Sequence, residues 1–410
     1  MSELSMLIYP WDVQADGADR VIDTVAGLGV DRLEIATAYH SAEVLSPRRT
    51  DRVFVRAEAN TVHLPLADAT FSGLSIPQST IAKSDPELYP QLRAAADASG
   101  IGLGGWGIAF HNTRLALEAA DAAILSCFGD RFTHGLCATN PASRTYAREL
   151  FAGLAATGLF DRLLAESVSY LLQSHGHPHE LWGARLDVLT CYLLSLCFCE
   201  FCLAAAGERG IDGEALRSAV ASELHRTWNA PFPGGRTADA GQELASLLLA
   251  WPDLAAYARM RLDTVNSLVA ELVAASPVPF TLSAAVWGRP APMNWLEGVD
   301  LSASLATVDG FVLESYFPTA AEVAAEIDHT QAVAARLPQS APLTVALTLW
   351  PTHHANRADF LGKIETVIAS GVDRIALYNY GTATADTLSW VADAASLITD
   401  AASLIKGAAR

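Results

Sequence analysis

The stretch GVDRLEIATAY, residues 29–39, combines a turn, an acidic residue and a run of apolar side chains. The same pattern returns three times, as GLFDRLLAESVSY at 158–170, TVDGFVLESYFP at 307–318 and GVDRIALYNYG at 371–381. Most copies follow an Ala- and Leu-rich stretch with helical spacing, such as ADRVIDTVAGL. A buried apolar strand that follows an amphipathic helix is the repeating unit of a parallel sheet. The repeats therefore predict an α/β fold.

Further apolar segments between these copies complete a set of eight predicted strands. They are 6–12, 32–39, 101–110, 162–169, 280–287, 310–317, 343–350 and 374–380. Eight such units predict a (β/α)₈ TIM barrel, whose functional groups lie at the carboxyl ends of the strands. A doubly wound open sheet is the alternative, but no glycine-rich phosphate-binding motif follows the first predicted strand.

Two insertions interrupt the expected barrel. Residues 40–95 contain few helical patterns and several Pro, Ser and Thr, which predicts a long loop after the second strand. Residues 171–275 are mostly helical in pattern and separate the fourth strand from the fifth. No charged run or low-complexity linker divides the chain, so we expect one elaborated domain over 1–410.

The composition of the chain indicates which classes of partner it is unsuited to bind. Its 410 residues carry a net charge of −18, which disfavours nucleic acid and anionic membrane surfaces as partners. The N-terminus MSELSMLIYPWD has no basic or long apolar region of a secretory signal, and no segment has the length of a membrane span. We therefore expect a cytoplasmic protein.

Three cysteines stand close together in CFCEFC, residues 197–202. In a reducing compartment such clusters are more often metal ligands than disulfides, and zinc takes four of them in a tetrahedron. Cys191 and Cys137 are the candidates for the fourth ligand. The alternative is that these are reduced cysteines that pack as small apolar side chains.

The two cysteine segments together resemble the family-42 glycoside hydrolases, the β-galactosidases built on a (β/α)₈ barrel. The resemblance rests on Cys137, Asn140, Pro141 and Tyr146, followed by Cys197, Cys199 and Cys202. It implies a structural zinc ion bound by Cys137, Cys197, Cys199 and Cys202, without an open position for catalysis. The motif ATAYHS, the HN pair at 111–112 and the histidine-rich stretch at 175–180 also resemble a set of uncharacterised bacterial barrel proteins, which implies no activity.

Two glutamates end predicted strands, Glu166 the fourth and Glu314 the sixth. Glycosidic cleavage needs two carboxyl groups, one that protonates the leaving oxygen and one that attacks or activates water. The resemblance implies that Glu166 is the acid/base, although Ala165 replaces the family's preceding Asn. The family's nucleophile ends strand seven, where this chain has no carboxylate, so Glu314 is the candidate for the second role. The alternative for both is a rim salt bridge with an arginine such as Arg289 or Arg374.

Aromatic and polar side chains cluster near the predicted strand ends. The candidate substrate-binding residues are Trp11, Asp12, Tyr39, His40, Trp106, His111, Asn112, Trp287, Tyr316, Trp350, Asn379 and Tyr380. Aromatic rings and side-chain amides that recur at the ends of most predicted strands predict a polar pocket of carbohydrate size. A single such residue would more often serve only to pack the core or the rim of the barrel.

The segment HGHPHE is a second candidate metal site, since His175, His177 and His179 with Glu180 suit a catalytic divalent cation. Its spacing matches no established zinc motif, and Pro178 favours a plain polar loop.

The function expected is therefore cleavage of a small glycoside by two carboxyl groups. The alternatives are a metal-dependent sugar isomerase, epimerase or lyase, and a non-catalytic sugar-binding barrel. The helical insertion is also a candidate surface for a homo-oligomer.

Overall fold

A computed structural model describes residues 2–50, 52–175, 183–184, 186–230, 240–284 and 291–408. Eight parallel strands form a closed barrel, because β1 pairs with both β2 and β13. In chain order they are β1 (Glu3–Ile8), β2 (Arg32–Tyr39), β6 (Gly102–Ile108), β9 (Arg162–Glu166), β10 (Phe280–Ser283), β11 (Gly310–Glu314), β12 (Leu343–Thr348) and β13 (Arg374–Tyr378). All eight predicted strands and the (β/α)₈ barrel are confirmed.

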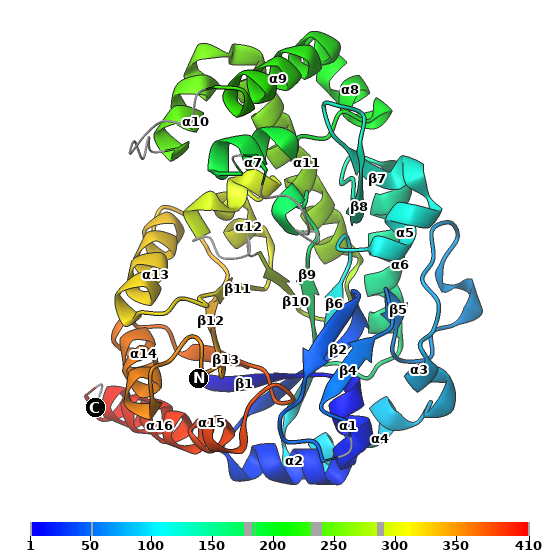
Figure 1. Cartoon of the computed structure of the whole chain (residues 1–410). Helices are drawn as coiled ribbons and strands as arrows, with labels where there is room; N and C mark the ends of the chain where they lie inside the picture. Colours follow the sequence, from blue (N-terminus) through cyan, green and yellow to red (C-terminus); the bar gives the residue numbers. More distant parts are fainter. Residues whose placement is uncertain are drawn as a thin grey trace.

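Helices surround the barrel on its outside (Figure 1). They include α2 (Ala18–Gly27), α4 (Leu88–Ser99), α6 (Pro141–Ala156), α11 (Pro252–Ala275), α12 (Leu301–Thr307), α13 (Ala320–Ala334), α14 (Arg357–Ala369) and α16 (Val391–Ala408). Local sequence sets their ends, as at α6, where the Asn140 side chain accepts hydrogen bonds from the backbone of Ala142 and Ser143 and Pro141 follows it. No helix in the described ranges is long and apolar enough to cross a membrane.

The first insertion is more structured than its sequence predicts. It contains the antiparallel hairpin β3 (Ala42–Leu45) and β4 (Phe54–Ala57), the short strand β5 (Thr61–Val62) and helix α3 (Thr80–Ser84). The predicted boundary at 95 is wrong, since α4 already begins at Leu88. Leu88, Tyr89, Leu92 and Ala96 recur at helical spacing and are buried, which explains the early start.

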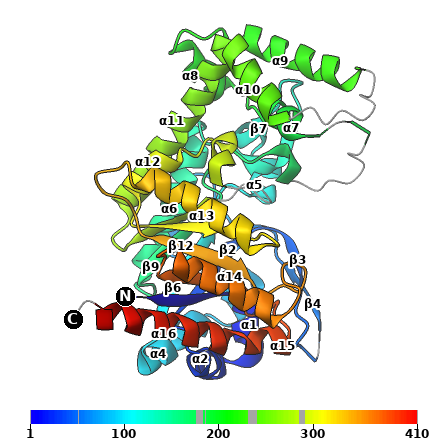
Figure 2. The same cartoon turned by 90° about the vertical axis from the view of Figure 1, so that its left-hand side faces the viewer.

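The second insertion is helical, as expected. Helices α7 (Val188–Leu194), α8 (Glu200–Gly207), α9 (Gly213–Trp228) and α10 (Ala240–Ala250) form a layer at one end of the molecule, at the top of Figures 1 and 2. A further excursion after β6 was not predicted. It forms the hairpin β7 (Ala123–Leu125) and β8 (Arg131–Leu136), whose connecting turn contacts α9 and which leads directly to Cys137.

Small side chains leave the barrel axis open. Barrel interiors are usually filled by branched residues in layers. Three of the inward-facing residues are alanines, namely Ala36 on β2, Ala346 on β12 and Ala376 on β13, and all three belong to the buried interior cluster. Glu34, two residues before Ala36 on β2, is 2% exposed and forms an ion pair with Arg162. The resulting cavity extends from the strand ends down to this pair.

Candidate active site

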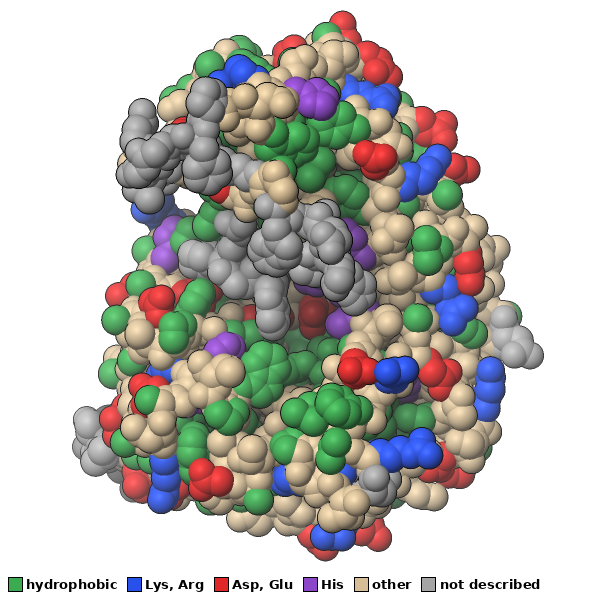
Figure 3. Space-filling model, in the orientation of Figure 1, with side chains coloured by type: hydrophobic (Ala, Val, Ile, Leu, Met, Phe, Trp, Pro, Cys, Tyr) green, Lys and Arg blue, Asp and Glu red, His purple; other side chains and the backbone are tan. Residues whose placement is uncertain are grey.

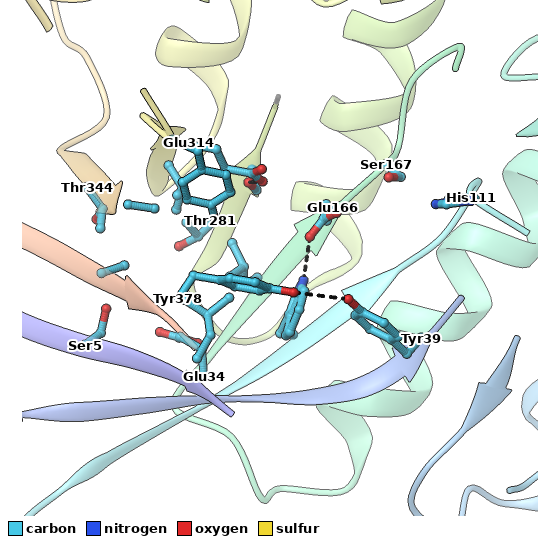
Figure 4. A pocket seen from close by; sticks show the side chains of 18 of the residues that line it. Ser5, Glu34, Tyr39, His111, Glu166, Ser167, Thr281, Glu314, Thr344 and Tyr378 are labelled. Carbon is cyan, nitrogen blue, oxygen red and sulfur yellow. Dashed lines mark hydrogen bonds between the residues drawn. The ribbon is translucent and has the colours of Figure 1, made fainter. Parts of the chain in front are cut away.

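A cavity of about 430 Å³ opens at the carboxyl ends of the barrel strands, and Glu166 and Glu314 both line it. Acidic and histidine side chains are visible in the hollow on this face of the molecule (Figure 3). Figure 4 shows the two glutamates directed into the same space, with Tyr378 and Tyr39 beneath them in that view. The volume lies within the range of small-molecule sites. The two predicted acids thus share one pocket.

Glu166 ends β9 and lies against Trp106 of β6. The Trp106 indole N–H donates to Glu166 Oε2 at 2.8 Å. Burial raises the pKa of Glu166 to about 8, and the negative charge of Glu314 acts in the same direction. The hydrogen bond from Trp106 acts in the opposite direction, because it stabilises the ionised form. Glu166 is therefore a carboxyl group that keeps its proton near neutral pH.

Glu314 ends β11 and accepts a hydrogen bond from the Ser283 hydroxyl of β10. Burial raises the pKa of Glu314 to about 7, the hydrogen bond from Ser283 lowers it, and the charge of Glu326 raises it. Two interacting carboxyl groups with these pKa values hold about one proton between them near pH 7.5. One acid and one base are thus present together, which is the combination that acid–base catalysis needs.

Three tyrosine hydroxyls form a hydrogen-bonded cluster near the two glutamates. Tyr9 and Tyr39 are hydrogen-bonded at 3.0 Å, Tyr39 and Tyr378 at 3.4 Å, and Tyr9 also contacts Tyr378. Burial raises the pKa of Tyr378 to about 12 and those of Tyr9 and Tyr39 well above the usual value. All three therefore stay neutral, and Tyr39 and Tyr378 line the cavity together with the carboxyl pair.

The structure divides the predicted substrate-binding residues into two groups. Those that line the cavity are Tyr39, His40, Trp106, His111, Tyr316 and Trp350. Those that lie outside its lining are Trp11, Asp12, Asn112, Asn379 and Tyr380. Trp287 lies outside the described residues.

The five residues outside the lining serve local structure instead. Asn112 caps α5 (Thr113–Glu118) and Trp11 stacks on Tyr9 with ring centroids 4.4 Å apart. Asp12 accepts from the backbone of Tyr9, Asn379 accepts from that of Gly381, and the Tyr380 hydroxyl donates to Asp16. Each was predicted from its position next to a strand end, but each side chain makes these local contacts and is not among the residues that line the cavity.

Histidines form one wall of the cavity. His40 stacks on His111 at 4.2 Å between ring centroids, and His175 meets His111 edge-on at 4.5 Å. Burial lowers the pKa of His175 to about 4, so this ring is neutral at neutral pH. His177 and His179 lie outside the described residues, and the predicted second metal site therefore stays untested.

Cys137 joins the three cysteines of the insertion in one buried cluster. The sulfur atoms of Cys137, Cys197, Cys199 and Cys202 all lie within 4.8 Å of one another, and this is the only group of potential metal ligands found among the described residues. Cys137 Sγ is 3.6 Å from Cys199 Sγ and 3.5 Å from Cys202 Sγ. Cys191 is not a member, since its thiol contacts Ser174. The cluster could hold a metal ion that joins the β7–β8 hairpin to the helical insertion.

Several residues of the site had not been predicted. Tyr378 and Ser283 line the cavity from the ends of β13 and β10. Both face inward because residues two apart on a strand point to the same side, as Ala376 and Tyr378 do. Alternation along the assigned strands would have found them. Glu297 and Glu326, which are buried near Glu314, had no comparable pattern.

No protein-family model matches the chain, and no curated protein matches its sequence. Solved structures with a similar fold include a β-galactosidase from the psychrophilic Marinomonas ef1 (11% identity, 98% of this chain and 60% of that chain, TM-score 0.56). A GH42 β-galactosidase from G. stearothermophilus matches at 13% identity over 97% of this chain and 56% of that chain, with a TM-score of 0.54. An α-L-fucosidase isoenzyme from Paenibacillus thiaminolyticus matches at 12% identity over 97% and 49%, with a TM-score of 0.50.

The chain thus spans about half to three fifths of the length of these proteins, which are 49% to 60% covered. At such low identity the likeness concerns the fold. The barrel implied by the resemblance to family-42 glycoside hydrolases is the barrel that this chain forms.

Proposed function

We propose that this chain is a glycoside hydrolase that cleaves a small neutral glycoside, with Glu166 as the acid and Glu314 as the base or nucleophile. The observation that carries the proposal is the pair of carboxyl groups in one cavity, with the pKa of Glu166 raised to about 8 and that of Glu314 to about 7. The group with the higher pKa retains the shared proton and can donate it to the leaving oxygen. The hydroxyl of Ser283 favours the ionised form of Glu314.

The lining supports a neutral carbohydrate as the substrate. Trp106, Tyr316 and Trp350 offer flat apolar faces, and the tyrosine and histidine side chains offer hydrogen bonds. The one cationic side chain other than histidine among the described lining residues is Arg162, which is paired with Glu3 and Glu34 at the deep end. An anionic sugar would find no free cation there.

The proteins with a similar fold are named as galactosidases and a fucosidase, and we extend only that reaction class to this chain. The resembled family places its second catalytic carboxylate on strand seven. Here β12 is strand seven, and its buried residues are uncharged. We propose that Glu314, on strand six, takes that role.

We further propose that the four cysteines bind zinc. Four thiolates at about 2.3 Å from one zinc ion, at the corners of a tetrahedron, are about 3.8 Å apart. The measured sulfur separations of 3.5 and 3.6 Å fit this arrangement. Because all four cysteines are buried, such a site would have no open position and would stabilise the insertion rather than catalyse.

The test is a panel of chromogenic glycosides assayed with the wild type and with Glu166→Gln and Glu314→Gln. Each variant should lose at least about a thousandfold in kcat on the glycoside that the wild type cleaves. Glu271→Gln removes an ion-paired carboxylate of α11 far along the chain and is the matched control. Wild-type turnover that both glutamine variants retain would disprove the assignment. Turnover that needs an exchangeable metal would favour an isomerase or lyase, and sugar binding without turnover would favour a binding protein.

A further inference from the structure

The short 3₁₀ helix η4 (Ala291–Glu297) contacts the segments that follow β9 and β10, and the carboxylate of Glu326 on α13 links it to the residue that follows β11. We infer that Glu297, at the end of η4, is a positioning residue that holds the segment after Glu166 in a fixed relation to Glu314. The inference rests on the proposed function, and Glu297 itself does not line the cavity.

Glu297 fastens η4 to the chain that follows Glu166. Its Oε2 accepts from the Ser169 hydroxyl at 3.1 Å and its Oε1 from the backbone N–H of Leu172 at 3.3 Å. Its backbone carbonyl accepts from the N–H of Tyr170 at 2.9 Å. Three hydrogen bonds at one residue therefore fix the segment that begins three residues after Glu166.

Other hydrogen bonds connect η4 to the segments that follow β10 and β11, the strand that ends at Glu314. The buried carboxylate of Glu326 accepts from the backbone of Ala291 at 3.0 Å and from the hydroxyl of Ser315, the residue after Glu314. The side-chain amide of Asn294 donates to the carbonyl of Ala284 at 2.6 Å, just after β10. One short helix thus ties together the ends of β9, β10 and β11.

Charge favours an ionised Glu297. The Arg261 guanidinium lies over the Tyr170 ring at 4.6 Å, is 1% exposed, and has no hydrogen-bond partner within the described ranges. Its charge and the bonds from Leu172 and Ser169 oppose the burial that raises the pKa of Glu297 to about 7. Gly298 has φ +83°, and a Cβ there would lie 3.1 Å from Tyr170, so the chain after Glu297 packs directly on this group.

The test compares Glu297→Ala and Glu297→Gln with the wild type on the best chromogenic glycoside. Glu297→Ala removes both side-chain bonds, and we expect kcat to fall about 10- to 100-fold with KM changed less than about threefold, because a small displacement of a catalytic group has that effect. Glu297→Gln keeps the size and one acceptor, and we expect it to restore most of kcat. It also removes a negative charge near Glu314, so the acid limb of its pH profile should move to lower pH.

A second readout needs no turnover. Because Trp106 donates to Glu166, the pH-dependent fluorescence that disappears in Trp106→Phe reports the ionisation of Glu166. Displacement of the segment weakens this hydrogen bond, so the midpoint in Glu297→Ala should move to higher pH. The control Glu271→Gln should keep the wild-type midpoint and kcat.

The two hypotheses fail differently. If the wild type cleaves no glycoside, the proposed function fails, whereas the fluorescence midpoint still tests the role of Glu297. If Glu297→Ala keeps the wild-type kcat per folded molecule and the wild-type midpoint, the positioning role is disproved and the proposed function stands.

Discussion

Replacement of Trp106 by phenylalanine should shift one limb of the pH profile and leave the other in place. The substitution removes the indole N–H that donates to Glu166 Oε2 at 2.8 Å. A hydrogen bond to a charged group contributes about 1.5–3 kcal/mol, and about 1.4 kcal/mol corresponds to one pH unit. Since this bond stabilises the ionised carboxylate, its loss raises the pKa of Glu166. The basic limb, set by a group whose pKa is about 8 in the wild type, should therefore move up by about 1 to 2 pH units.

The assay is kcat/KM for a chromogenic glycoside measured across the pH range at constant ionic strength, which reports the acid and base of the free enzyme. The acid limb should stay near pH 7, because Ser283 and Glu326 rather than Trp106 act on Glu314. Trp390→Phe is the control, since Trp390 is 7% exposed and packs on Phe360, away from the cavity lining. A basic limb that stays in place or moves to lower pH in Trp106→Phe would refute the assignment of Glu166 as the acid.

Three further predictions concern stability and metal. The pKa of Glu166 is about 8 in the folded protein and 4.5, its ordinary value, in the unfolded chain. Ionisation of Glu166 therefore lowers the stability of the folded state as the pH rises above 4.5, and the full effect is reached above pH 8. Glu166→Gln should thus raise the free energy of unfolding at pH 9 by on the order of 5 kcal/mol, with no gain at pH 4, in urea titrations. Arg162→Met leaves a buried carboxylate without its partner and should cost about 3–5 kcal/mol. Arg56→Met removes an ion pair whose arginine is 84% exposed and should cost less than about 1 kcal/mol. Metal analysis should find one zinc per chain, and Cys199→Ser should lose it with a large fall in melting temperature, whereas Cys191→Ser should retain it.

The barrel could be predicted because its repeating unit is local. In GVDRLEIATAY and its three relatives, the turn and the apolar run lie within about a dozen residues. Four of the eight strands were found in this way, and the other four were found as apolar segments between these copies. The hairpin formed by β7 and β8 was missed because its strands are three and six residues long and pair irregularly. The hairpin contacts Phe198 and helix α9, which are distant in the sequence, and no local pattern reports such contacts.

The two acids of the site could be predicted because their side chains belong to strands. Glu166 and Glu314 are the last residues of β9 and β11, so the barrel itself brings them to one opening. Asn112 and Asn379 follow strands by a few residues, and the turn conformation there directs their side chains toward backbone donors. Glu297 lies in a 3₁₀ helix, and its proximity to Leu172 over 125 positions of sequence is a property of tertiary structure alone.

The placement of the second carboxylate on strand six follows from the order of the strands. Side chains from alternate strands of such a barrel share one layer of the interior. Glu166 on strand four and Glu314 on strand six therefore belong to the same layer, two strand spacings or about 10 Å apart at the backbone. The strand between them presents Ser283, which is in register with Glu166 and donates to Glu314. A carboxylate on strand seven would belong to the layer of Ser283 on strand five, which is not the layer of Glu166. The distinct environments of the two acids, the Trp106 indole for Glu166 and the Ser283 hydroxyl for Glu314, thus arise from four consecutive strands, β6, β9, β10 and β11.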